Sequence, residues 1–177
     1  MNKEQLIHEF KSVHSLFIDD IEVLDEHDFV SYLKGKWSAG QQLEHIYLSV
    51  KPLIQVFLLP KFILKIFFGK AKRESISYDA MITKYSKVLE QGGKATSKYI
   101  PKKITIQQRA QLAKSLKSTI DTLLIKIKST KDQDLDEILV PHPLMGKLTL
   151  REMLYFSIYH AKHHHKSLKK NIVENKI

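Results

Sequence analysis

Apolar residues recur three or four positions apart through most of the 177 residues, and this spacing restricts the folds open to the chain more than any other feature. The first stripe consists of Leu6, Phe10, Val13 and Phe17, which share one face of a helix. Strand-like alternation is nearly absent. Several helices longer than two turns in one domain predict an all-α fold, a helical bundle.

Three of the expected helices begin at a capping box, in which Ser or Thr is followed three residues later by Gln or Glu. The pairs are Ser38 and Gln41, Thr105 and Gln108, and Thr149 and Glu152. A further helix is expected over 78–90, and the last helix is expected to end near residue 170. Two prolines leave the end of the helix after Trp37 open, and two more predict an irregular stretch over 140–146.

Composition narrows the class of protein. Hydrophobic residues make up 43% and charged residues 27%, which is typical of a soluble globular protein. The absence of Cys excludes disulfides, thiolate nucleophiles and Cys-ligated metals. The length predicts a single domain over residues 1–177, and the polar N-terminus lacks a signal peptide's apolar region, so we expect a cytoplasmic protein.

The last helix carries a candidate metal site. His160 and His164 are four residues apart, so both imidazoles lie on one helix face. A metal site in a bundle needs a third ligand from another helix, and His45, about two turns after the Ser38 cap, is the natural candidate. Its neighbours Gln41, Gln42 and Ser49 are expected to orient the ring or hold water.

Interpretations of these histidines that involve no metal also stay open at this point. A run of histidines on a lysine-rich helix is typical of a solvated face, to which we assign His163 and His165. His45 alone is more typical of a hydrogen-bonded core histidine, and His160 also lies within helical reach of His163. His14, near the first apolar stripe, is either a partly buried histidine or a neighbour of the site.

Three segments resemble the DinB-like superfamily of metal-dependent helical proteins. They are residues 37–45 (WSAGQQLEH), residues 141–149 (PHPLMGKLT) and the His-x-x-x-His of residues 159–164. The order of the helices fits across nearly the whole chain. One departure is Ser167, where many relatives carry Gln three residues after the second helical His.

The resemblance implies a four-helix bundle with an irregular segment between helices 2 and 3. It also implies that His45, His160 and His164 hold a divalent metal, zinc or nickel, with open positions filled by water. Such a metal activates water as a nucleophile or binds a substrate thiol. Characterised relatives include thiol S-transferases, so the resemblance favours a transferase or hydrolase acting on a small molecule, such as a low-molecular-weight thiol. No catalytic side chain is indicated.

A net charge of +10 supports a different function, a non-catalytic basic module for nucleic acid, a membrane surface or a protein partner. No helix-turn-helix or RNA-recognition motif is present, so specific nucleic-acid binding is not expected. Residues 53–68 are too apolar for one core face, yet Pro60, Lys61 and Lys65 make them too short to span a membrane. We favour a core or subunit contact, and thus a possible homodimer, over a membrane-surface helix with snorkelling lysines.

Overall fold

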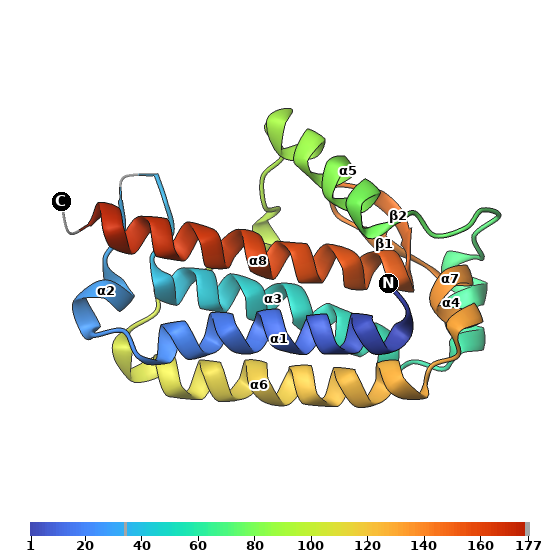
Figure 1. Ribbon diagram of the computed structural model, residues 1–177, viewed down its shortest axis with the longest axis horizontal. Coiled ribbons are helices and arrows are strands. Elements are labelled where there is room, and N and C mark those ends of the chain that lie inside the picture. Colours follow the sequence, from blue (N-terminus) through green and yellow to red (C-terminus); the bar gives the residue numbers. More distant parts are fainter. Residues whose placement is uncertain (34, 176–177) are drawn as a thin grey trace.

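Four long helices form the body of the protein. A computed structural model describes residues 1–33 and 35–175. The long helices are α1 (Lys3–Glu22), α3 (Ala39–Leu58), α6 (Ile106–Ser129) and α8 (Leu150–Glu174). They lie side by side (Figure 1), and α3 and α1 each pack against both α6 and α8. The predicted all-α four-helix bundle is confirmed.

Shorter elements cover the ends and one side of the bundle (Figure 1). They are α2 (Glu26–Val30), α4 (Lys61–Phe68), α5 (Tyr78–Glu90), a 3-10 turn (Ser97–Tyr99), α7 (Asp132–Glu137), β1 (Leu139–His142) and β2 (Gly146–Thr149). The bounds of α5 match the expected helix over 78–90. Within the described residues, no helix combines the length and the apolarity needed to cross a bilayer.

The stretch over 140–146, expected to be irregular, belongs to an antiparallel hairpin of β1 and β2. Val140 pairs with Leu148, and both side chains are buried against the bundle. Pro141 is exposed in this two-stranded ribbon, where a proline is tolerated because an edge position needs no ladder N–H. Two strands of four residues each are too short to leave a clear signal in the sequence.

The segment between α3 and α5 is only partly irregular. Helix α3 continues through Pro52 to Leu58, and after Pro60 the chain forms α4. Leu53, Ile54, Phe57 and Leu64 are buried, so part of residues 53–68 does join the core as expected. The outer face of α4, however, is exposed to solvent.

The Ser38 capping box brings α3 close to α2. Ser38 Oγ accepts from Gln41 N at 3.2 Å, and Gln41 Oε1 accepts from Ser38 N at 3.1 Å. Gly40, in the first turn, lies so close to α2 that an added Cβ would be 2.8 Å from two ring atoms of Phe29. Glycine is therefore required here by packing rather than by its backbone angles.

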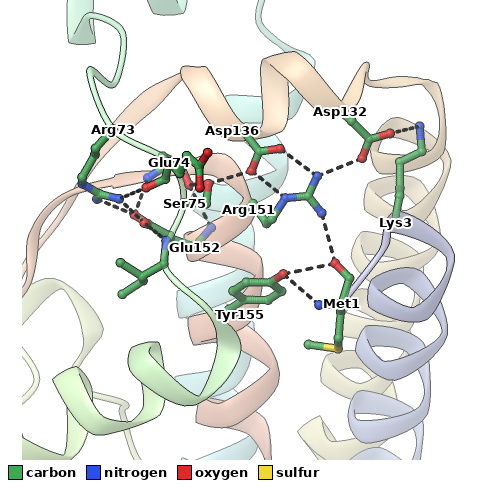
Figure 2. A network of polar contacts seen from close by, with 12 residues as sticks. Met1, Lys3, Arg73, Glu74, Ser75, Asp132, Asp136, Arg151, Glu152 and Tyr155 are labelled. Atoms are coloured by element: carbon green, nitrogen blue, oxygen red, sulfur yellow. Dashed lines mark hydrogen bonds and ion pairs between the residues drawn. The ribbon is translucent and has the colours of Figure 1, made fainter.

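A polar network ties the start of α8 to three other parts of the chain (Figure 2). The wholly buried carboxylate of Glu152 accepts from Thr149 N at 2.9 Å, Ile76 N at 2.8 Å and Arg73 Nη2 at 2.9 Å. Burial alone would raise the pKa of Glu152, but these hydrogen bonds hold it below its ordinary value. The same helix end is thus joined to the segment that precedes α5.

The neighbouring Arg151 extends the network to α7 and the N-terminal residue (Figure 2). Its guanidinium donates to Asp136 Oδ1 at 2.7 Å and to Asp132 Oδ1 at 2.8 Å. Tyr155, one turn further along α8, donates its hydroxyl to the carbonyl of Met1 at 3.2 Å. These bonds fix the position of α8 along the bundle.

Candidate metal centre

His45 projects from α3, a helix whose start is fixed by the Ser38 capping box. Seven residues after the cap, its side chain is 5% exposed and faces α8. Its Nδ1 lies 2.7 Å from the carbonyl oxygen of Tyr99, in the 3-10 turn that packs against α3. Because a carbonyl oxygen only accepts, Nδ1 carries the proton, and the lone pair of His45 is at Nε2.

His160 and His164 project from one face of α8, as their four-residue spacing predicts. Both side chains are buried, with exposed fractions of 5% and 8%. Their ring centroids are 4.7 Å apart and lie 4.9 and 4.7 Å, respectively, from that of His45. One ring nitrogen from each of the three residues lies within 4.8 Å of the other two. The structure thus brings the three predicted ligands together.

Aromatic rings enclose this three-histidine group on two sides. Trp37, just before α3, lies 4.7 Å from the His45 ring and stacks on the His164 ring at 6.0 Å between centroids. Phe156, one turn before His160 on α8, stacks on His160 at 4.9 Å. These contacts limit rotation of all three imidazoles and exclude most of the solvent around them.

Burial sets the charge of the group. Desolvation lowers the pKa of His45 and holds the pKa values of His160 and His164 well below the ordinary value of 6.5. The positive charge that each histidine would carry lowers the pKa values of its neighbours further. All three imidazoles are therefore neutral at pH 7, which is the form that binds a metal ion.

The donor set fits a divalent metal. His45 Nε2 and His160 Nε2 are 3.0 Å apart, and the lone pair of His45 points into this gap. Two ring nitrogens this close repel unless a proton or a cation lies between them. Ligand nitrogens of a tetrahedral zinc are about 3.3 Å apart, from bonds of about 2.05 Å. The observed spacing is thus close to that of two ligands of one ion.

The sequence match agrees with this geometry. A family model described as the DinB superfamily matches residues 30–168, well over half of the chain and inclusive of all three histidines. The chain belongs to the DinB superfamily. Searches of curated proteins and of solved structures found no match.

In this DinB-superfamily bundle, the residue that orients His45 is not one that the sequence indicated. Gln41 is occupied by the capping box, Ser49 donates to the carbonyl of Ile46 at 2.8 Å, and Gln42 donates to the carbonyl of Trp37 at 3.3 Å. The Tyr99 carbonyl, rather than one of these side chains, bonds the His45 ring, and a role for them in holding water stays a prediction. A backbone acceptor more than fifty residues away leaves no signal in residue type, so only the folded chain shows it.

Tyr85 of α5 is a second residue near the site that the sequence did not single out. Its ring is 6% exposed and meets His160 edge to face at 6.2 Å. Burial raises the pKa of Tyr85 to about 12, so its hydroxyl stays protonated at neutral pH. Its ring adds a further apolar wall beside His160.

The remaining histidines divide between the surface and the core. His163 is exposed, as expected, and it lies outside the three-histidine group. His165, also assigned to the solvated face, instead lies 2.6 Å from Asp20 of α1 with an 18% exposed side chain. His14 is fully buried, where it bonds to the carbonyl of Phe10 on its own helix and stacks on the Phe10 ring.

Proposed function

We propose that this protein is a metal-dependent enzyme that acts on a small molecule through His45, His160 and His164. The observation that carries the proposal is the convergence of three buried, neutral imidazoles from two helices, without a carboxylate among them. Three histidines leave coordination positions open, which is the pattern of catalytic rather than structural zinc sites. Zinc or nickel is the expected metal, since imidazole suits both.

A divalent metal held there would act as a Lewis acid that lowers the pKa of a bound water or thiol. The chain's own residues do the rest. The Tyr99 carbonyl keeps the lone pair of His45 on Nε2, and Trp37 and Phe156 hold the rings and exclude water. The expected reaction is thiol S-transfer, with the thiol supplied by the substrate because the chain has no Cys, or hydrolysis.

The first experiment measures metal content. Untagged protein is purified, and bound zinc, nickel, copper, iron and manganese are quantified by mass spectrometry. We expect about one ion per chain, lost in His45→Ala and His160→Ala. His163→Ala is the matched control, because His163 neighbours the group on α8 but is exposed. No bound metal, or equal loss in His163→Ala, would refute the proposed site.

The second experiment tests catalysis. Protein loaded with zinc or nickel is incubated with a low-molecular-weight thiol and an electrophilic acceptor, and with ester and amide substrates, each with and without a chelator. Turnover that needs metal and is lost in His160→Ala supports an enzyme. Stoichiometric metal without turnover on any of these substrates would favour a bundle that only holds metal. A cytoplasmic location remains a prediction.

A further inference from the structure

The outer face of α4 is apolar and exposed, although α4 is anchored firmly to the protein. Leu64, on the inner face of α4, is fully buried. Beyond Gly69 the backbone joins the hairpin region, where Ala71 N donates to the Glu137 carbonyl at 2.7 Å and Leu139 N donates to the Gly69 carbonyl at 3.3 Å. The exposed face is therefore held in a fixed place at one end of the bundle, and α2 lies at the other end (Figure 1).

Five large apolar side chains on α4 and at the end of α3 just before it are exposed, and together we call them the α4 patch. Its members and their exposed fractions are Leu58 (56%), Leu59 (43%), Phe62 (64%), Ile66 (75%) and Phe67 (75%). Phe62 and Ile66 are four residues apart and share one helix face. Single exposed apolar residues are common on soluble proteins. A group of large ones on a firmly held element is rare and marks a site of contact with another molecule or a membrane.

The charges around the α4 patch indicate the partner. Between Glu44 and Glu74 the chain has no acidic residue, but it carries basic residues on α4 and directly after it. Lys65 and Lys70 pair with Asp134 at 2.6 Å and Glu137 at 3.1 Å. Lys61, Lys72 and Lys147 have no ion-pair partner among the described residues. Lys61 is half-buried and donates to the Phe57 carbonyl at 3.3 Å, whereas Lys72 and Lys147 are exposed, and Lys147 Nζ lies 2.7 Å from the carbonyl of Phe68 at the end of α4. An apolar face with a basic rim is complementary to an anionic lipid surface.

We propose that the α4 patch docks on the surface of an anionic membrane, with Phe62, Ile66 and Phe67 entering the headgroup region and the lysines contacting lipid phosphates. A second copy of the chain fits less well. Two copies that met at this surface would bring together two basic rims, each on a chain with a net charge of +10. The proposal is independent of the metal site, because no residue of the patch belongs to the three-histidine group.

The test is vesicle co-sedimentation of the full chain, with phosphatidylcholine vesicles that contain or lack phosphatidylglycerol. We expect binding that needs phosphatidylglycerol and weakens at least about tenfold between about 0.05 and 0.5 M NaCl. Ile66→Ser should weaken binding roughly tenfold, and Ile66→Ser with Phe67→Ser further. The matched control is Val173→Ser, another exposed β-branched helix residue (61%), near the far end of α8.

Thermal unfolding monitored by circular dichroism checks that the variants fold. We expect them to fold because the replaced side chains are exposed to solvent. Light scattering over a range of concentrations tests for a dimer. Absence of vesicle binding, or equal binding by wild type and the double variant, would overturn the proposal. A dimer that the double variant abolishes, without vesicle binding, would also overturn it and assign the patch to a second copy. Chelator should not change the lipid binding of the wild type.

Discussion

Replacing His14 should remove a measurable part of the protein's sensitivity to acid. His14 lies in α1, is fully buried and stacks on Phe10. Its Nδ1 donates to the Phe10 carbonyl at 2.7 Å, and its Nε2 has no hydrogen-bond partner within residues 1–33 and 35–175. A second proton would therefore place an unpaired charge in the core. Desolvation by burial accordingly lowers the pKa of His14 from 6.5 to about 4.

The difference in the pKa of His14 between the folded and the unfolded chain sets the sign and the size of the change in stability with pH. Below pH 6.5 the unfolded chain binds a proton at His14 that the folded chain does not, so the free energy of unfolding falls as the pH falls from 6.5 toward 4. At about 1.4 kcal/mol per unit of pKa, the whole loss is about 3 kcal/mol. Roughly 2 kcal/mol of it is reached at pH 5. A loss of this size is a large fraction of the free energy of unfolding of a typical domain, which is about 5–15 kcal/mol.

The assay is urea unfolding of wild type and His14→Leu at pH 7 and pH 5, with chelator present so that metal does not contribute. The other titrating groups are shared, so they cancel in the difference between the two proteins. We expect His14→Leu to gain about 2 kcal/mol relative to wild type on going from pH 7 to pH 5. His8→Leu, at an exposed position of the same helix, should show no such gain. An equal difference at both pH values would refute the reasoning.

Three further predictions concern the site and its supports. Bound metal should be lost as acid protonates His160, whose pKa burial holds well below 6.5. Metal analysis after dialysis at successively lower pH should show retention at neutral pH and loss in acid, and an occupancy that does not change with pH would exclude histidine ligands. Glu152→Ala should cost about 2–3 kcal/mol in urea unfolding, because it removes half of the α8 capping box and the acceptor of the Arg73, Thr149 N and Ile76 N hydrogen bonds. Glu174→Ala, which breaks only surface pairs with Lys36 and Lys170, should leave the urea midpoint nearly unchanged. Gly40→Ala should cost about 1–3 kcal/mol by the same method, since its Cβ would overlap Phe29; an unchanged midpoint would show that α2 moves away freely.

Much of the bundle could be predicted because its signals are local. The capping boxes at Ser38 and Thr149 form as the spacing of their residues indicates. The four-residue spacing of His160 and His164 places both on one face, and a fixed helix start sets the height of His45 on α3. Each of these needs only the repeat of a helix and its first turn.

The parts that could not be predicted depend on contacts between distant segments. The hairpin of β1 and β2 exists because Val140 and Leu148 are buried against helices. The pairing of His165 with Asp20 needs α1 and α8 side by side. The Tyr99 carbonyl lies near His45 only after the loop before α6 has packed. No periodicity in one segment carries that information.

Helix α8 makes one rigid body of two sites that are far apart. Glu152 and His160 are eight residues apart on an unbroken helix, a distance of about 12 Å at about 1.5 Å per residue. A helix has little axial compressibility, so the bonds of Arg151, Glu152 and Tyr155 that fix the start of α8 also fix the height of His160 and His164 relative to His45. Residues that touch none of the three imidazoles thereby help to set the spacing between them.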